Sequence, residues 1–224
     1  MQLQGVLFDL DGTILDNNVY HLKAWKQYLK NIGREVSDEE YRLNFNGRTN
    51  KDVVEYIHKR KMTDEEAQPF YLSKEDLYRE IYKPHIKPID GFLTLLNEIE
   101  KAHIPMGIAT SGILPNIDFM FDHIPIRQYF KAVIYSKHIK RGKPDPEIYI
   151  KAAEELNADP AKCVVFEDAT VGIQSAKGAG MKVIAITTTH PENELAGADK
   201  IIKDYTQITL KDLETLFLKT NRNS

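Results

Sequence analysis

Cysteine is almost absent from this sequence, since Cys163 is the only one among 224 residues. A single cysteine cannot form an internal disulfide, and it cannot supply the several thiolates of a cysteine-rich zinc site. A disulfide-stapled scaffold and a zinc module of that kind are therefore excluded. Cys163 falls within an apolar run, so we expect its side chain to be buried and inert.

An excess of charge of either sign is also lacking. The 30 basic and 33 acidic residues give a formal net charge of -3. This balance offers no electrostatic reason to expect a nucleic acid or an anionic membrane as a partner. Any attraction for an anionic ligand must then come from a local site.

Long apolar runs are missing as well, and none approaches the length that crosses a membrane. Residues 1–4 (MQLQ) lack the basic and apolar segments of a signal peptide, so we expect a cytoplasmic protein. The length, with 42% hydrophobic and 28% charged residues, suits one globular domain or one domain with an insertion. Nothing in the sequence requires more than a monomer.

The most informative stretch that is present is residues 5–13, GVLFDLDGT. Its apolar start is too short for a helix and indicates a buried strand, which leads into Asp9, Asp11 and a turn at Gly12. Two carboxylates this close repel each other unless a positive charge lies between them. Because hard oxygen ligands suit Mg²⁺, the pair predicts a magnesium site.

A calcium loop of the EF-hand type is the competing interpretation of this aspartate pair. Such a loop has glycine at its sixth position and a bidentate glutamate at its twelfth. Here Gly12 occupies the fourth position and Tyr20 the twelfth, and a strand precedes the loop. The calcium loop is therefore excluded, and a purely structural pair of acids is the remaining alternative.

Helical spacing dominates residues 16–87, where no segment resembles a buried strand. Apolar and aromatic residues recur at helical intervals from about residue 18 to residue 32, and Trp25 among them is expected in a local core. Further helix starts are predicted at Ser37, where Glu40 would complete a capping box, before Val53, at Thr63 and at Ser73.

Strand and helix patterns alternate over residues 88–224, which indicates a parallel sheet covered on both faces. We therefore predict an α/β core made of residues 1–15 and 88–224, with a helical insertion at residues 16–87. In open α/β sheets, ligands bind at the edge from which this insertion emerges. The later strands are predicted at 104–110, 131–136, 162–168, 182–186 and 200–202, and the helices at 91–102, 146–156, 171–179 and 210–218.

Side chains suited to phosphate chemistry follow four of the predicted strands. Because the carboxyl ends of parallel strands share one edge of the sheet, we expect these side chains to converge. A metal held by carboxylates, a lysine and backbone N–H groups would together neutralise a phosphoryl group. The residues are Asp9 and Asp11, Thr110, Ser111 and Gly112, Lys143, and Glu167 and Asp168.

The order of these motifs resembles the four-motif set of the haloacid dehalogenase superfamily. The matching elements are DLDGT at residues 9–13, Thr110, Lys143 with Pro144, and Glu167 with Asp168. The helical segment resembles the small helical cap of the β-phosphoglucomutase-like branch, so the resemblance covers nearly the whole chain. It implies a Rossmann-like parallel core with an inserted helical cap.

The resemblance also implies a reaction through an aspartyl-phosphate intermediate. Asp9 would be the nucleophile, and Asp11 would act first as general acid and then as general base. Thr110 and Lys143 would bind the transferred phosphoryl group. These four residues are the catalytic set that we expect.

The cofactor implied by the resemblance is Mg²⁺. The Asp9 carboxylate, the main-chain carbonyl of Asp11 and the Asp168 carboxylate would hold it. Glu167 would lie close by, either as a ligand or behind the ligands. The partner would be a small phosphorylated metabolite.

Substrate contacts are expected partly from the cap and partly from the turn after the second core strand. His21 matches a family histidine that can contact the general acid, and Arg48 next to Gly47 would be the anion contact of the cap. Ser111 and Gly112 would complete the substrate site from the core. A structural histidine and a solvated arginine are the alternatives for His21 and Arg48.

The preferred function is hydrolysis of a sugar phosphate or a similar small phosphate monoester. A β-phosphoglucomutase needs a second phosphate grip, and its cationic positions are occupied here by Asn46, Asn50 and residues 112–114. Mutase activity and inorganic pyrophosphatase activity are the alternatives. A non-catalytic phosphate-binding protein is disfavoured because Asp9, Asp11, Lys143 and Asp168 are all present.

Overall fold

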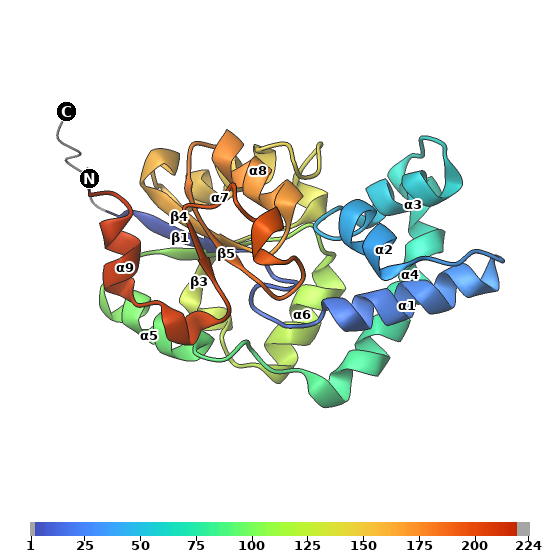
Figure 1. Ribbon diagram of the computed structural model, residues 1–224, viewed down its shortest axis with the longest axis horizontal. Helices are drawn as coiled ribbons and strands as arrows, with labels where there is room; N and C mark the ends of the chain where they lie inside the picture. Colours follow the sequence, from blue (N-terminus) through green and yellow to red (C-terminus); the bar gives the residue numbers. More distant parts are fainter. Residues whose placement is uncertain (1–2, 219–224) are drawn as a thin grey trace.

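Six parallel strands form a single sheet in the order β3-β2-β1-β4-β5-β6. The structure is a computed structural model that describes residues 3–218 (Figure 1). This strand order is that of a Rossmann-like α/β fold, so the predicted fold class is confirmed. The strands are β1 (Gly5–Phe8), β2 (Met106–Ala109), β3 (Phe130–Ile134), β4 (Cys163–Glu167), β5 (Lys182–Ile186) and β6 (Lys200–Ile202).

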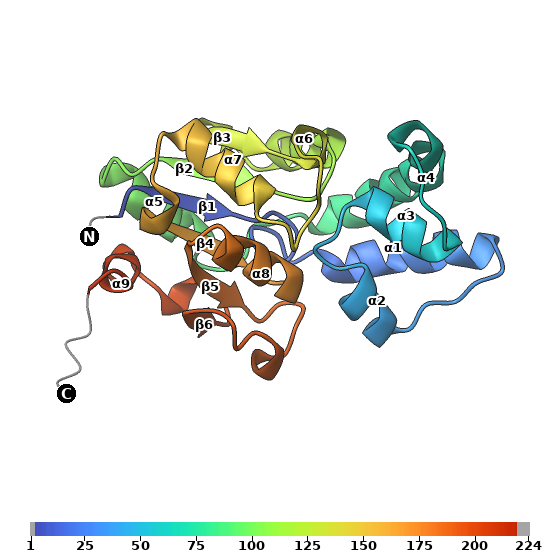
Figure 2. The ribbon, with the colours of Figure 1, turned by 90° about the horizontal axis from the view of Figure 1, so that it is seen from above.

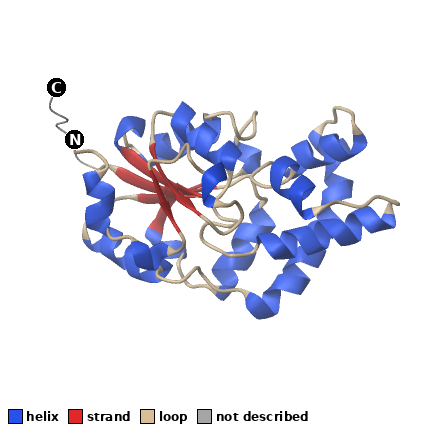
Figure 3. Cartoon of the chain, viewed as in Figure 1, coloured by secondary structure: helices blue, strands red, loops and turns tan. Residues whose placement is uncertain are grey.

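Helices cover both faces of this sheet (Figures 2 and 3). Successive strand residues point to opposite faces, so Val6 and Phe8 join the apolar cluster on one face and Leu7 joins the cluster on the other. Helices α5, α6 and α9 pack on the first cluster, and α7 and α8 on the second. Their bounds are α5 (Phe92–Lys101), α6 (Leu114–His123), α7 (Glu147–Leu156), α8 (Thr170–Gly178) and α9 (Leu210–Thr215).

The four helices between β1 and α5 form a separate layer beside the C-terminal edge of the sheet (Figure 1). They have an apolar cluster of their own, in which Trp25 is only 3% exposed. The expected core role of Trp25 in this segment is thus confirmed. The helices are α1 (Asn18–Asn31), α2 (Asp38–Asn44), α3 (Asn50–His58) and α4 (Asp64–Tyr82).

The chain enters and leaves this helical segment at neighbouring points. The Ile89 N–H donates to the Ile14 carbonyl at 2.9 Å, and Leu15 forms an antiparallel bridge with Pro88. The two connections therefore lie side by side, although more than seventy residues separate them in sequence.

Two predictions at helix starts are wrong. Ser73 does not begin a helix, because α4 runs unbroken through it and buries the adjacent charges Lys74 and Glu75 against each other. Glu40 does not complete a capping box. Its N–H donates to Ser37, but its carboxylate binds Arg34 instead of turning back to the helix end.

The sequence patterns also failed to reveal α6. Ile113 precedes this helix and has no side chain that could cap its first turn, so the N-cap signal is missing, although Pro115 lies in the first turn. The described helices include none that is both long and apolar enough to cross a membrane.

Candidate active site

Asp9 and Asp11 leave the end of β1 toward different partners. Asp9 is 5% exposed, and its Oδ1 accepts a hydrogen bond from Lys143 Nζ at 2.6 Å. Asp11 Oδ1 accepts from Asn17 Nδ2 at 2.6 Å and lies 3.3 Å from His21 Nε2. One carboxylate therefore belongs to the interior of the core, and the other faces the helical segment.

Lys143 is the central cation of the site, and its side chain is fully buried. Besides Asp9, its ammonium donates to Glu167 Oε1 at 2.5 Å. Burial opposes the charged form, but the carboxylates of Asp9 and Glu167 outweigh it and raise the pKa of Lys143. Lys143 therefore remains positive and offsets part of the acidic charge.

Asp9, Glu167 and Asp168 bring one carboxylate oxygen each to within 4.8 Å of one another. Burial raises the pKa of Asp168 to about 7, helped by the negative charge of Glu167. Burial likewise raises the pKa of Asp9, and Glu167 and Asp168 add to the shift although Lys143 opposes it. One ammonium is thus too little positive charge for this cluster, which fits a divalent cation.

An oxygen of Asp168 supports the same conclusion. Its Oδ1 atom is buried and has no hydrogen-bond partner within residues 3–218. Buried polar atoms in native structures are nearly always satisfied, so this oxygen is suited to a ligand such as Mg²⁺. Its Oδ2 atom accepts from Asn18 Nδ2 at 3.0 Å and from Asn46 Nδ2 at 3.2 Å.

Glu167 differs from its neighbours because the protein already satisfies its carboxylate. Oε1 accepts from Lys143 and from the Tyr149 hydroxyl, and Oε2 accepts from the N–H groups of Asp168 and Ala169. The Asp11 carboxylate lies outside the acidic cluster altogether. Asp9 and Asp168 are therefore the side chains best placed to hold a metal.

The turn after β2 places Thr110, Ser111 and Gly112 at the same edge. The Thr110 hydroxyl accepts from the Gly112 N–H at 3.0 Å, which leaves its own proton free to donate. The Ser111 hydroxyl donates to the Gly47 carbonyl at 2.9 Å. Ser111 thus ties the core to the helical segment in this structure.

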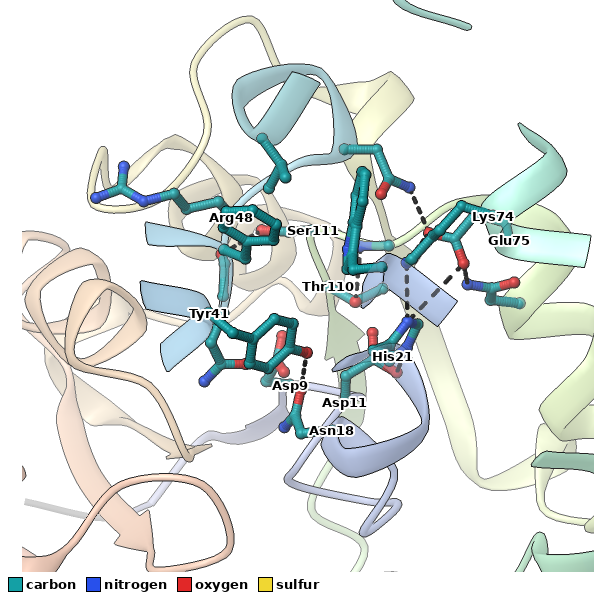
Figure 4. A pocket seen from close by; sticks show the side chains of 18 residues that line it. Asp9, Asp11, Asn18, His21, Tyr41, Arg48, Lys74, Glu75, Thr110 and Ser111 are labelled. Carbon is teal, nitrogen blue, oxygen red and sulfur yellow. Dashed lines mark hydrogen bonds and ion pairs between the residues drawn. The ribbon is translucent and has the colours of Figure 1, made fainter. Parts of the chain in front are cut away.

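Gly47 brings the loop between α2 and α3 onto the core. Its φ is +73°, and a Cβ here would lie 2.8 Å from the side chains of Ala169 and Val171. Only glycine fits this close approach. The next residue, Arg48, lines the pocket, but its guanidinium extends outward and away from His21 and Glu75 (Figure 4).

His21 lies between Asp11 and a second charged pair. Its Nδ1 is 3.0 Å from Lys74 Nζ, and its ring stacks on Tyr78 with 3.6 Å between ring centres. Because an ammonium can only donate, Nδ1 accepts from Lys74, and the ring donor is Nε2, which faces Asp11. His21 therefore orients Asp11 from the helical segment.

Several residues that line the pocket were not predicted as site residues from the sequence. Lys74 and Glu75 were assigned to a helix start, although they continue the helical spacing of Tyr71, Tyr78 and Tyr82. Charged residues on an otherwise aromatic face were the available signal. No sequence signal pointed to the others, Asn18, Tyr41 and Asn116, which also line the pocket.

Asp9, Asp11 and the turn after β2 line a cavity of about 50 Å³, together with residues of the helical segment. A buried water needs roughly 10–15 Å³ on this measure, so the cavity has room for only a few waters. Figure 4 shows Asp9 and Asp11 on one side of it and Lys74 and Glu75 on another. The helical segment therefore leaves little room above the sheet edge in this structure.

Together, the Rossmann-like sheet and the acidic site at its edge define a hydrolase of the predicted superfamily. The chain belongs to the haloacid dehalogenase-like hydrolases, because the model of that family matches residues 6–186.

Named relatives narrow this assignment. Validoxylamine A 7'-phosphate phosphatase of Streptomyces hygroscopicus subsp. limoneus is 32% identical over 209 residues, which cover 90% of this chain and 94% of the relative. The β-phosphoglucomutase of Bacillus subtilis (strain 168) is 32% identical over 228 residues and 93% of each chain. The predicted resemblance to the β-phosphoglucomutase-like branch is confirmed.

A solved structure agrees over nearly the full chain. The HAD hydrolase, family IA, variant 3, from Entamoeba histolytica HM-1:IMSS has 35% identity and a TM-score of 0.85, and the match covers 96% of this chain and 99% of that one. At the level of enzyme class, the prediction of a phosphatase of this superfamily is confirmed.

Proposed function

We propose that this protein is a Mg²⁺-dependent phosphatase that hydrolyses a sugar phosphate through an aspartyl-phosphate intermediate. The observation that carries the proposal is the convergence of Asp9, Lys143 and Asp168 beneath the cavity. The similarity to validoxylamine A 7'-phosphate phosphatase and to a β-phosphoglucomutase supports a sugar phosphate as the substrate.

In the first half of the reaction, a carboxylate oxygen of Asp9 attacks phosphorus, and the bond from phosphorus to the ester oxygen breaks. Asp11 supplies the proton that the leaving oxygen takes up. In the second half, water gives a proton to Asp11 and attacks phosphorus, and the bond to Asp9 breaks. Phosphate leaves, Asp9 is a free carboxylate again, and Asp11 carries a proton, as it did when the first half began.

The surroundings of Asp11 suit this double role. Burial raises the pKa of Asp11, but His21 beside it and the hydrogen bond from Asn17 outweigh burial and lower the pKa. Asp11 is therefore ionised before substrate arrives. The negative charge of a bound phosphate next to Asp11 would favour its protonated form, which is the form that the first step needs.

Asp9 and Asp168 would hold Mg²⁺ together with the main-chain carbonyl of Asp11, and Glu167 would position Lys143 behind them. When bound, the ion would supply the positive charge that offsets the phosphoryl and carboxylate groups. The Thr110 hydroxyl, which is free to donate, would bind the phosphoryl group beside Lys143.

We also propose that residues 16–87 act as a cap domain on a core made of residues 1–15 and 88–224. The paired connections at Ile14–Leu15 and Pro88–Ile89 would be the hinge. A cavity of about 50 Å³ is too small for a hexose phosphate, so the cap would have to open for entry and then close over the substrate. His21, Gly47 and Arg48 would contact the substrate from the cap, and Ser111 and Gly112 from the core.

Mutase activity is the second candidate, favoured by the 32% identity to a β-phosphoglucomutase. A mutase must hold a second phosphate while the first is transferred. Asn46 and Asn50 occupy positions where contacts to that second phosphate are expected. Instead, the Asn46 amide donates a hydrogen bond to Asp168, and the Asn50 amide donates one to Glu75. Water is therefore the favoured acceptor.

The proposal is tested by phosphate release from a panel of sugar phosphates, p-nitrophenyl phosphate and pyrophosphate. We expect turnover with Mg²⁺, none in EDTA, and a loss of about a thousandfold or more in kcat/KM for Asp9→Asn. Asp122→Asn, at an exposed position on α6, is the matched control and should keep wild-type activity. A folded Asp9→Asn enzyme with undiminished turnover would refute the mechanism.

A further inference from the structure

Glu75 is a buried carboxylate in the wall of the cavity, on the side away from Asp9 (Figure 4). Its Oε1 accepts from Asn50 Nδ2 at 2.6 Å and from Lys74 Nζ at 2.9 Å. Its Oε2 accepts from Asn116 Nδ2 at 2.9 Å. Three different elements, α3, α4 and α6, thus hold this carboxylate in place.

The Glu75 carboxylate is ionised whenever the enzyme is folded near neutral pH. Burial raises its pKa, but the charge of Lys74, the neighbouring His21 and the hydrogen bond from Asn116 outweigh burial and lower the pKa to about 2. In return, Glu75 neutralises Lys74, the buried cation on this side of the cavity. Lys74 is therefore not free to grip an anion.

A second phosphate would meet unfavourable chemistry at this wall. It would lose its water shell beside a negative charge, while Lys74 stays paired and the Arg48 guanidinium extends away (Figure 4). A hydroxyl group meets no such cost, because it can donate to the carboxylate. A carboxylate offers about four acceptor sites, and Glu75 uses three of them.

We propose that Glu75 is a specificity residue that selects phosphate monoesters with an uncharged, hydroxyl-rich far end and rejects substrates that carry a second phosphate. The rejected class includes sugar bisphosphates and pyrophosphate. This inference rests on the phosphatase function proposed above and names the substrate class of that site.

The test compares kcat/KM for glucose 6-phosphate and glucose 1,6-bisphosphate, which differ only in the second phosphate. The wild type should prefer the monophosphate by about a hundredfold or more, and Glu75→Gln should reduce that preference by about tenfold or more. The ratio of two substrates on one preparation is independent of the folded fraction, so a purely structural role would leave it unchanged. Glu80→Gln, at an exposed position on the same helix, should keep the wild-type ratio.

A second variant covers the case in which Glu75→Gln does not fold. Asn50→Lys leaves Glu75 in place and adds a cation beside it, so it should move the ratio in the same direction. Equal kcat/KM values for the two substrates in the wild type would overturn the inference. So would a ratio of kcat/KM values that is unchanged in both variants.

The two proposals fail in different ways. If the wild type with Mg²⁺ releases phosphate from none of the panel, including p-nitrophenyl phosphate, the proposed function fails, and this inference fails with it. If p-nitrophenyl phosphate is hydrolysed and only the mono-to-bisphosphate ratio is unaffected by the variants, the role of Glu75 alone is refuted.

Discussion

Asp9 and Asp11 are separated by one residue, yet their pKa values shift in opposite directions. Burial among other carboxylates raises the pKa of Asp9, whereas His21 and Asn17 lower that of Asp11 against the effect of burial. The difference comes from the turn after β1, which sends one side chain into the core and the other toward the cap. A nucleophile and an acid–base group can thus be built from one short motif.

Glu75 should contribute to stability in a pH-dependent way. Its pKa is lowered from 4.5 to about 2 by Lys74, His21 and Asn116, against the opposing effect of burial. A carboxyl group whose folded-state pKa is depressed stabilises the protein above its unfolded pKa and loses that effect as the pH falls. The contribution should therefore be complete above about pH 5 and decline toward pH 2.

The measurement is urea unfolding of the wild type and of Glu75→Gln at several pH values. Between about pH 5 and pH 3, the free energy of unfolding of the wild type should fall by roughly 2 kcal/mol more than that of the variant. Parallel pH profiles of the two proteins would show that Glu75 has an ordinary pKa.

Helix α8 packs directly against the Glu167 carboxylate, and Gly172 is the residue of the helix at this contact. A Cβ at Gly172 would overlap both carboxylate oxygens of Glu167. Gly172→Ala should therefore lower the free energy of unfolding by about 2 kcal/mol and reduce activity, because Glu167 would lose its hold on Lys143. Denaturant unfolding and phosphate release measure the two effects.

Gly178 in the same helix provides the matched control. Its position is exposed, and the nearest atom to an added Cβ is 3.5 Å away, an ordinary contact. Gly178→Ala should leave activity unchanged and alter stability by less than about 1 kcal/mol. Similar losses in both variants would mean that Glu167 does not set the position of α8.

The elements that the sequence predicted best are those with a strong apolar pattern. The core strands and the buried position of Trp25 could be predicted because their large apolar side chains are stable only when they are buried. Helix α6 was missed because it begins without a capping residue, and α4 was divided because Lys74 and Glu75 look like exposed charges in sequence. Their burial depends on Asn50 and Asn116, which are distant in sequence.

The same limit applies to the candidate site. Residues that follow core strands could be predicted, since a parallel sheet places strand ends on one edge. Other contacts of the site depend on how the helical segment docks on the core. They are the hydrogen bond from Ser111 to the Gly47 carbonyl and those from Asn18 and Asn46 to Asp168. Short motifs carry no information about that docking.

For the molecule as a whole, Mg²⁺ should stabilise the folded state, because the ion binds a cluster that exists only after folding. Added Mg²⁺ should raise the Tm of the wild type, and EDTA should reverse the change. Asp168→Asn should abolish this response. Differential scanning calorimetry in both conditions provides the measurement.

The metal-free proteins provide a control for this prediction. Burial and Glu167 raise the pKa of Asp168 to about 7, so its ionised form destabilises the apo fold at higher pH. At pH 8 in EDTA, Asp168→Asn should therefore be at least as stable as the wild type. A variant that is less stable in EDTA, or that keeps the Mg²⁺ response, would contradict this view of the cluster.

The covalent role of Asp9 can be observed directly in an Asp11→Asn variant with p-nitrophenyl phosphate. Because p-nitrophenolate leaves without a proton, the first half-reaction should proceed, while water attack without a general base should be slow. We predict a burst of one p-nitrophenolate per active site and, by mass spectrometry after an acid quench, one phosphoryl group on Asp9. No burst, or a phosphoryl group on another residue, would contradict Asp9 as the nucleophile.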